Sequence, residues 1–277
     1  AIAVAFSPDG TLFAAAGLES RVLLWDVAAT LGVSATVAVP ASDGIVASEP
    51  ITDPVRIIDT GEYQLRSLAF STDGSKLLTG GNEVIQQWSV QNGTQITPTI
   101  EVGSKVISVA YSPNAALIAG ADESGTVMLW NAATGESLRE LTGQRRPVRS
   151  VAFSQDGATV IGASGDGFLH QWDASTGQAL SRRQGNEQSL TTAAFSPDGQ
   201  VIAAGSNDGL LTLWNAKNDA ARRTLGGHRN VGDLAVTPDG QTIVSADGPT
   251  LSIALGRRTV RRWDTAAGRE LAKWFIA

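Results

Sequence analysis

The stretch LTTAAFSPDGQVIAAGSNDGLLTLWN, residues 190–215, decides the fold. It begins with a short apolar segment rich in β-branched side chains, 190–195, which favours a β-strand. Ser-Pro-Asp-Gly at 196–199 then predicts a turn, because proline presets φ, aspartate can bond to the backbone two residues on, and glycine accepts a positive φ. Two further strands are expected around the tight turn at 207–209, and residues 222–225 are expected to form an outer one. The local pattern is a unit of four short antiparallel strands.

This unit recurs along the whole chain. The residue before each Ser/Thr-containing turn is, in order, Phe6, Phe70, Tyr111, Phe153, Phe195 and Val236. Each is followed by a tryptophan, after 18 or 19 residues in five copies and after 27 in the last: Trp25, Trp88, Trp130, Trp172, Trp214 and Trp263. Three successive tryptophan intervals are 42 residues long. A four-stranded unit of this size cannot bury both its faces alone, whereas copies stacked around an axis can, as in propeller blades.

With these motifs the chain resembles the WD-repeat (Trp-Asp repeat) β-propeller family. The Trp-Asp pair is intact at 25–26, 172–173 and 263–264, and is relaxed to Trp-Asn at 130–131 and 214–215 and to Trp-Ser at 88–89. The resemblance covers essentially the whole chain and implies an all-β propeller of four-stranded antiparallel blades. Six blades are recognisable; the seven that are commoner in the family would require a degenerate blade or sequence outside this chain. We expect one domain, 1–277, with blades at approximately 1–62, 63–102, 103–144, 145–186, 187–227 and 228–277.

Two copies are longer than the others. Residues 28–53, which are rich in small residues and contain Pro40, Pro50 and Asp43-Gly44, are expected to form an inserted loop before an outer strand at 55–58. The last copy has eight extra residues before its tryptophan. The family usually closes its ring by splitting one blade, but here every blade is continuous. Closure is therefore expected to rest on packing between the first and last blades, or on sequence outside this segment of a longer chain or complex.

The resemblance implies a buried network of His, Ser or Thr, Asp and Trp in well-formed blades. This sequence has one Gly-His pair, at 227–228, and we expect His228, Ser245, Asp247 and Trp263 to form the network in the last blade. The six repeat tryptophans are expected to be structural as well. A His-Ser-Asp set also invites a catalytic-triad interpretation, but no oxyanion site or pocket is recognisable. In the other blades the network implied by the resemblance is incomplete. Gln144 and Asn186 replace its histidine, and Glu19 and Ser124 replace its aspartate. Asp166 and Asp208 retain the aspartate in their blades.

Several other chemistries are poorly supplied. The absence of cysteine excludes disulfides and thiolate chemistry, and the two histidines give little material for a zinc site. We expect His170 to be a packed strand residue. The turn aspartates occur once per blade and cannot converge on one calcium ion, so turn formation explains them better: Asp9, Asp73, Asp156, Asp198 and Asp239. We expect no cofactor and no metal.

Charge argues against nucleic acid as a partner. The chain has 21 basic and 27 acidic residues, for a net charge of −6. Five Arg-Arg pairs occur, but no aromatic residues interleave with them to stack bases. Two of the pairs, 182–183 and 222–223, fall on outer strands, where charge opposes edge-to-edge aggregation. No apolar run is long enough to span a membrane, so we expect no membrane insertion and a cytoplasmic location.

The function predicted is that of a non-catalytic scaffold that binds protein partners, as a regulatory or sensory domain of a larger protein. Arginine in excess of lysine, together with many alanines, hints at a bacterial source. The resemblance places binding residues at the entry to inner strands and in second turns: Arg66, Arg149, Glu19, Glu83, Glu123 and Asn207. The alternative is an enzyme or small-ligand propeller with its site in the central channel, which needs converging polar groups on the inner strands. Asp233 is the only acidic residue on these strands.

Overall fold

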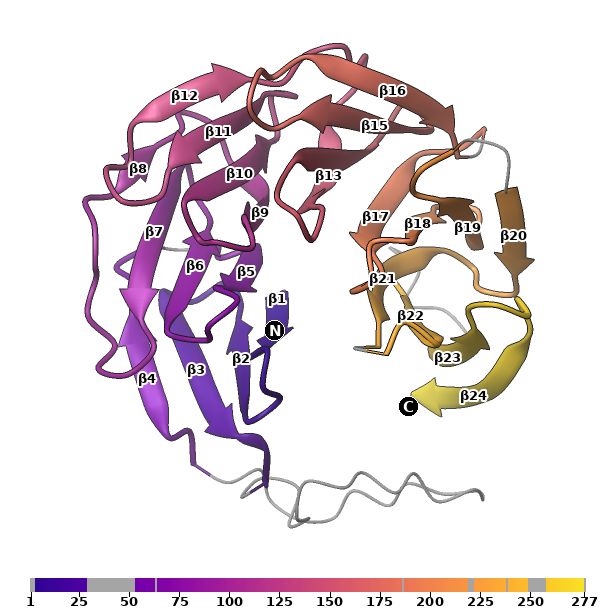
Figure 1. Cartoon of the computed structure of the whole chain (residues 1–277). Helices are drawn as coiled ribbons and strands as arrows, with labels where there is room; N and C mark the ends of the chain where they lie inside the picture. The colour runs from indigo at the N-terminus through magenta and orange to yellow at the C-terminus, as the bar shows by residue number, and fades with distance from the viewer. Residues whose placement is uncertain are drawn as a thin grey trace.

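The computed structural model describes residues 3–28, 53–62, 64–185, 187–218, 222–237, 239–248 and 258–276. The strands form six separate four-stranded antiparallel sheets, arranged as the blades of a six-bladed β-propeller (Figure 1). The predicted fold class is therefore confirmed. In each blade the chain runs from an inner strand beside the central axis to an outer strand at the rim. Residues 29–52 and Asn186 lie outside the described residues, and with them nearly all of the predicted loop at 28–53.

The blades are numbered here in chain order. Blade 1 contains β1 (Ala3–Phe6), β2 (Leu12–Ala16), β3 (Arg21–Asp26) and β4 (Arg56–Asp59); blade 2 contains β5 (Ser67–Phe70), β6 (Lys76–Gly80), β7 (Val84–Ser89) and β8 (Ile100–Glu101). Blade 3 contains β9 (Val106–Tyr111), β10 (Leu117–Asp122), β11 (Val127–Asn131) and β12 (Ser137–Glu140); blade 4 contains β13 (Val148–Phe153), β14 (Thr159–Ser164), β15 (Phe168–Asp173) and β16 (Ala179–Gln184). Blade 5 contains β17 (Leu190–Phe195), β18 (Val201–Ser206), β19 (Leu210–Asn215) and β20 (Arg222–Gly226); blade 6 contains β21 (Val231–Val236), β22 (Thr242–Asp247), β23 (Arg258–Asp264) and β24 (Glu270–Ile276).

The repeated turn between the first two strands of a blade is held by its own side chains. In blade 5 the Ser196 hydroxyl donates to Asp198 at 2.5 Å and accepts the Val201 N–H at 2.9 Å. Asp198 also accepts the Gln200 N–H at 3.0 Å, and Gly199 has a φ of +67°. The hydrogen bonds from Ser196 and Gln200 hold the pKa of the Asp198 carboxyl below its ordinary value. The aspartates of these turns thus stabilise the hairpins in ionised form.

Adjacent blades are joined by five hydrophobic clusters. Each cluster contains the tryptophan of the later blade packed against the preceding blade. In the cluster between blades 3 and 4, for example, Trp172 lies with Leu129 and Leu141, and all three side chains are fully buried. The tryptophans of blades 2 to 6 are all 5% exposed or less: Trp88, Trp130, Trp172, Trp214 and Trp263. Since no blade can bury both faces by itself, these junctions form the core of the protein.

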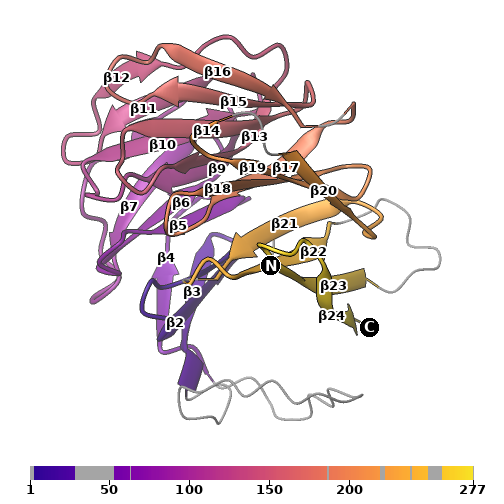
Figure 2. The ribbon, with the colours of Figure 1, turned by 45° about the vertical axis from the view of Figure 1, so that its right-hand side comes forward.

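The junction between blades 6 and 1 differs from the other five. Both ribbon views place the two ends of the described chain, β1 and β24, on the same side of the ring (Figures 1 and 2). Among the described residues no hydrophobic cluster connects these two blades. Trp25 is only partly buried, and Phe6 of β1 is 62% exposed. The packing expected to close the ring is therefore not built like the other five junctions.

Polar side chains add a second link between blades at the rim. Arg139 of β12 donates to the backbone carbonyl oxygens of Ala174, at 2.7 Å, and Ser175 in the third turn of blade 4. Equivalent donors come from Gln87, to Ala132 at 2.6 Å; from Arg183, to Asn215 at 3.3 Å and Ala216 at 3.1 Å; and from Arg223, to Ala266. These bonds connect blades 2 to 6 in sequence.

This arrangement corrects one interpretation made from the sequence. Arg183 was expected to be a solvated edge charge, but it is only 8% exposed and is committed to the neighbouring blade. Its neighbour Arg182 is exposed and lies over the Phe168 ring, 3.9 Å from the centroid. Alternation along β16 explains the difference, because successive side chains point to opposite sides of a strand.

Candidate interaction surface

The inner strands are tied together by hydroxyl groups that face the channel. Three serines occupy the same position of consecutive inner strands, and each accepts a backbone N–H from the next strand: Ser67 from Val109 at 3.0 Å, Ser108 from Val151 at 3.1 Å and Ser150 from Ala193 at 3.3 Å. Because inner strands of adjacent blades do not pair as a sheet, these side chains supply hydrogen bonds that the backbone of each blade cannot provide. The repeated serine of the inner strand is thus a structural residue.

Asp233 occupies the equivalent position in blade 6. One of its oxygens accepts the Thr192 hydroxyl at 3.2 Å and the Leu234 N–H at 2.8 Å. Asp233 is exposed to the channel, but the surrounding channel wall reduces the hydration of its carboxyl, and this desolvation raises its pKa above the ordinary value despite the two hydrogen bonds. A carboxylate here is less favourable than the serine that blades 2 to 4 carry at this position.

A cavity of about 740 Å³ lies in the channel, and six inner strands contribute to its lining. Its charged lining residues are Arg66, Arg149, Asp233 and Asp247. Arg149 on β13 is exposed, and Arg66 immediately precedes β5. Two of the candidates chosen from the sequence, Arg66 and Arg149, therefore lie at the same cavity.

Glu123 connects this cavity to the turns of blade 3. Its carboxylate oxygens lie 3.7 Å from Nη1 of Arg66 and 3.9 Å from Nζ of Lys105. The side chains of Arg66 and Glu123 are 35% and 51% exposed, so water screens the pair and it adds little to stability. Since breaking such a pair costs little, Arg66 remains available to a partner.

The other three candidates lie away from the cavity lining. Glu19, Glu83 and Asn207 are exposed in the second turns of blades 1, 2 and 5. Glu83 has a φ of +70°, and its carbonyl oxygen accepts the Val102 N–H at 2.8 Å. Glu83 thus also shapes the turn in which it lies. The structure brings Arg66 and Arg149 to one cavity and Glu123 to Arg66, but it does not bring these three to the cavity lining.

The predicted residues of the last blade lie within hydrogen-bonding distance of one another. His228 Nδ1 is 2.8 Å from Asp247 Oδ1, and His228 Nε2 is 2.6 Å from Ser245 Oγ, which also accepts the Trp263 indole N–H at 2.8 Å. Asp247 further accepts the N–H and hydroxyl of Thr259 at 2.6 and 2.7 Å. Burial lowers the pKa of His228, although Asp247 opposes this shift. A neutral imidazole that donates from Nδ1 and accepts at Nε2 satisfies every contact.

This geometry does not resemble a nucleophile site. Ser245 is 1% exposed, and its oxygen is engaged by both the indole and the imidazole. A serine nucleophile needs open space for a substrate carbonyl and nearby donors for an oxyanion. Neither is found around Ser245 among the described residues.

A second histidine pair was not foreseen from the sequence. His170 on β15 is 4% exposed, stacks on Trp172 with ring centroids 5.6 Å apart, and places Nε2 3.0 Å from Asp166 Oδ2. The acid at Asp166 and the strand position of His170 were both recognised, but separately. The sequence did contain a signal for the contact between His170 and Trp172. Residues two positions apart on a strand lie on the same face, and these two residues are so spaced.

Blade 3 exchanges the two polar residues of its second turn. Ser124 stands at the usual acid position, and the acid is instead Asp122, at the end of β10. The Ser124 hydroxyl donates to Asp122 Oδ1 at 2.6 Å, and the Thr126 N–H donates to the same oxygen at 2.9 Å. The turn therefore keeps a carboxylate acceptor, but at a different position. A comparison of the blades position by position does not reveal it.

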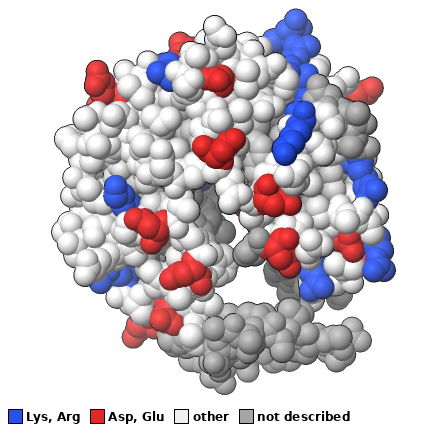
Figure 3. Space-filling view, in the orientation of Figure 1, with Lys and Arg blue, Asp and Glu red and all other residues white. Residues whose placement is uncertain are grey.

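The charge distribution agrees with the negative net charge. On the face in view in Figure 3, acidic side chains gather around the middle of the ring and basic ones lie mostly toward its edge. A nucleic-acid-binding face would show the reverse. No three His, Asp or Glu side chains in the described parts of the chain are arranged to hold a metal ion. Nor does any helix within the described ranges have the length and apolar character needed to cross a membrane.

Comparison with known families agrees with the blade geometry. The family described as “WD domain, G-beta repeat” matches residues 1–26, 97–131, 135–173, 177–215 and 220–264. These ranges include strands of all six blades, but β8 is the only strand of blade 2 inside them. Blade 2 is also the copy in which the Trp-Asp pair is changed to Trp-Ser.

Similarity to individual proteins is confined to segments. Protein tipD of Dictyostelium discoideum is 32% identical over 81 residues, 29% of this chain and 13% of that protein. The periodic tryptophan protein 2 homolog of Neurospora crassa is 29% identical over 85 residues (30% and 10%), and Protein HIR1 of Cryptococcus neoformans var. neoformans serotype D is 26% identical over 149 residues (50% and 16%). All three come from eukaryotes, so the comparison gives no support to a bacterial source. The matches span a small part of each relative.

Proposed function

Because this chain belongs to the WD-domain, G-beta repeat family, we propose that it is a non-catalytic scaffold that binds a protein partner at one mouth of its channel. The observation that carries the proposal is the cavity of about 740 Å³ with Arg66 and Arg149 in its lining. Arginine is an effective anchor residue at protein interfaces, since it combines a flat stacking surface with two-pronged hydrogen bonding. Arg149 lies on β13, and the backbone N–H of Arg66 donates to the Gly80 carbonyl oxygen at 2.9 Å just before β5, so the blades position both arginines at this surface.

The distribution of polar groups supports binding rather than catalysis. Most channel hydroxyls are already engaged in joining inner strands. Of the two carboxylates that line the cavity, Asp247 is engaged by His228 and Thr259, which leaves Asp233 alone. An acid–base pair of carboxylates is therefore not available for the alternative function, an enzyme with its site in the channel. The alternative function then reduces to the binding of a small anionic ligand by Arg66 and Arg149.

The test is partner capture from native lysate, identified by mass spectrometry. The double variant Arg66→Glu/Arg149→Glu reverses both charges at the cavity. The control is Arg182→Glu/Arg269→Glu, which makes the same charge change at exposed positions on outer parts of blades 4 and 6. We expect partners to be lost with the first variant and kept with the control. Equal capture by wild type and both variants would contradict the proposal.

A further inference from the structure

One position of the third strand carries a buried hydrogen-bond donor in four of the six blades. It lies two residues before the blade tryptophan and is occupied by Gln86, His170, Thr212 and Arg261 in blades 2, 4, 5 and 6. These residues are 6%, 4%, 2% and 8% exposed, respectively. Polar groups this deeply buried are retained where they have partners, so the position has a common use.

Three of these donors bond to the chain segment that enters their blade. Gln86 Nε2 donates to the Thr60 carbonyl oxygen at 3.3 Å, Thr212 Oγ1 donates to that of Gly185 at 3.3 Å, and Arg261 donates to that of Gly227. In blade 4 His170 instead pairs with Asp166. Arg261 additionally forms an ion pair with Glu270. In these four blades the space beside the tryptophan is therefore filled by an N–H or O–H donor, whereas blade 1 has Leu23 at this position.

Blade 3 lacks this donor. Its equivalent residue is Met128, which has no N–H or O–H to give. Gly120 of β10 is the equivalent of Ser245 in blade 6. Gly120 pairs with Val109 and Ser245 pairs with Leu234, and Val109 and Leu234 are both the fourth residue of their inner strand. Gly103, three residues before Val106, has the offset that His228 has from Val231. The three residues thus leave different amounts of space: a side chain at Gly103 would meet nothing within 4 Å, whereas a Cβ at Gly120 would lie 2.8 Å from the Trp130 ring, which takes up that place.

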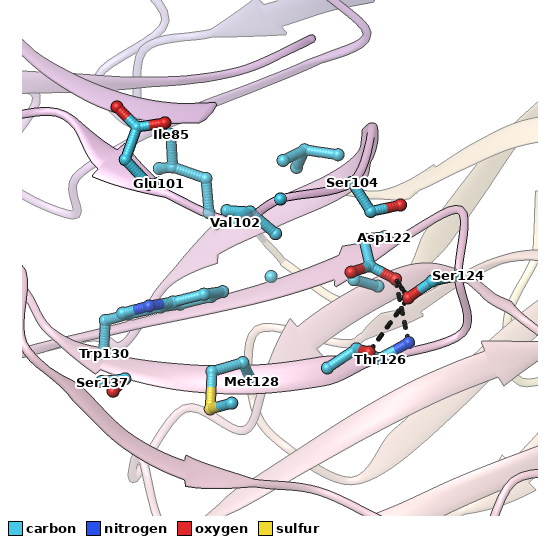
Figure 4. Close-up of a pocket in the computed structure, with 14 residues that line it drawn as sticks. Ile85, Glu101, Val102, Ser104, Asp122, Ser124, Thr126, Met128, Trp130 and Ser137 are labelled. Carbon is cyan, nitrogen blue, oxygen red and sulfur yellow. Dashed lines mark hydrogen bonds between the residues drawn. The ribbon is translucent and has the colours of Figure 1, made fainter. Parts of the chain in front are cut away.

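A pocket of about 360 Å³ occupies the corresponding space (Figure 4). Gly103, Gly120 and Met128 line it, with the Trp130 ring on one side and Val102 and Ile85 on another. The last blade has a hollow of about 340 Å³ in the same region, but neither Ser245 nor Trp263 lines it. The pocket of blade 3 therefore reaches deeper, to the tryptophan.

Asp122 contributes a carboxylate to this pocket, and one of its two oxygens forms no hydrogen bond with the residues that line the pocket. Asp122 is only 4% exposed, and both hydrogen bonds found for it, from Ser124 and Thr126, go to Oδ1. Figure 4 shows its other oxygen directed toward the middle of the pocket. This oxygen is open to the pocket rather than sealed from solvent, and a cationic N–H group that enters the pocket would form a charge-assisted hydrogen bond with it. Glu101 adds a second, exposed carboxylate to the wall.

We propose that this pocket binds an arginine side chain of a protein partner, which supplies the donor that blade 3 does not have. The guanidinium would stack on Trp130 and pair with Asp122, while its aliphatic stem would pack against Val102 and Met128. A planar group with several N–H donors fits this combination better than a compact ammonium does. The ion pair of Arg261 in blade 6 is the internal counterpart.

The experiment is a titration of the purified chain with N-acetyl-arginine methylamide, followed by NMR of the Trp130 indole and the Gly103 and Gly120 amides. The neutral isostere, N-acetyl-citrulline methylamide, is the ligand control. We expect saturable shifts at these three residues with the arginine derivative only. Absent shifts, or equal shifts with citrulline, would overturn the proposal.

Two substitutions locate the site. Asp122→Asn keeps an acceptor for Ser124 and Thr126 but removes the charge, and we expect it to weaken binding about tenfold or more, the scale of a lost charge-assisted hydrogen bond. Met128→Arg introduces the residue that blade 6 has at this position and should abolish binding. Met128→Leu, which is similar in size and apolar, should bind like wild type. Binding retained by Met128→Arg would overturn the assignment of the pocket.

This inference rests on the proposed scaffold function for its biological meaning, but its test does not. The titration detects binding of a defined small molecule to the pure chain, whereas the scaffold proposal is tested by partner capture at the channel mouth. The two proposals can therefore fail independently. If partners are lost with Arg66→Glu/Arg149→Glu but the arginine derivative does not bind, the scaffold proposal stands and the pocket proposal fails.

Discussion

His228 Nε2 lies 2.6 Å from the hydroxyl oxygen of Ser245, and this contact connects the segment that enters blade 6 to the second strand of the blade. The other ring nitrogen is 2.8 Å from Asp247. The tryptophan N–H, the serine hydroxyl, the imidazole and the carboxylate form one continuous chain of hydrogen bonds. Networks of this kind are worth most when every member is satisfied, as here.

Replacement of His228 by alanine should destabilise the protein. The change leaves Ser245 and Asp247 each short of a partner in a buried site, at a cost of roughly 1–3 kcal/mol. At this chain length about 1 kcal/mol corresponds to about 2–4 °C in Tm. Thermal melts should show a decrease of a few degrees, with partner capture unchanged. Full stability together with lost capture would refute a structural role.

The same histidine should make stability depend on pH. Unfolded, His228 titrates near its ordinary value of 6.5, whereas burial lowers its pKa in the folded protein. The folded state then binds fewer protons between the two values, so its stability is complete above about 6.5 and falls as the pH drops through this window. Urea unfolding of wild type and His228→Gln at about pH 7.5 and about pH 5.5 tests this. The stability advantage of wild type should shrink at the lower pH, and a constant advantage would argue against a neutral buried imidazole.

Arg183 and Arg182 form a matched pair for the rim contacts. Arg183→Met removes a buried cation that donates to Asn215 and Ala216, and should cost about 1.5–3 kcal/mol. Arg182→Met removes an exposed cation above Phe168, worth about 0.5–1 kcal/mol. Chemical denaturation of both variants measures the difference. Equal losses would mean that the contact between blades 4 and 5 does not contribute.

The blade tryptophans should fall into two classes. Trp172→Ala empties the junction between blades 3 and 4 and should cost roughly 3–5 kcal/mol, the range for large-to-small changes in a core. Trp25 is only partly buried, so Trp25→Ala should cost less than about 2 kcal/mol. Urea melts of the two variants decide this. A large decrease in the free energy of unfolding of Trp25→Ala would show that Trp25 is packed as tightly as the tryptophans of the other blades.

Removal of the charge at Asp233 should stabilise the protein at neutral pH. Its raised pKa means that the folded state binds more protons than the unfolded state between the ordinary value of 3.8 and the raised value. Stability therefore falls as the pH rises through this window, and the full penalty is present above it. Asp233→Asn should raise Tm at about pH 7, and the gain should vanish at about pH 3.5, where wild type is protonated as well. An unchanged Tm at neutral pH would contradict the desolvation argument.

Local chemistry allowed much of the fold to be predicted. Ser-Pro-Asp-Gly specifies its turn through contacts within six residues, as Ser196 and Asp198 show, so each copy could be recognised independently. The regular spacing of these turns and the tryptophans then required stacked four-stranded units. The residues around His228 were likewise foreseen, since the family pattern places them at fixed offsets.

What the sequence by itself determined was therefore the repeating blade, its turns and its tryptophan. The tertiary structure alone decided which side chains meet between blades. Arg183 differs from Arg182 only by one strand position, yet one is buried against the next blade and the other is exposed. The pocket beside Trp130 likewise depends on a junction, because Ile85 of blade 2 lines it together with Met128 of blade 3, 43 residues further along the chain. Repeats encode contacts within a blade, whereas the junctions depend on pairs of residues about 40 positions apart, and no local pattern specifies those pairs.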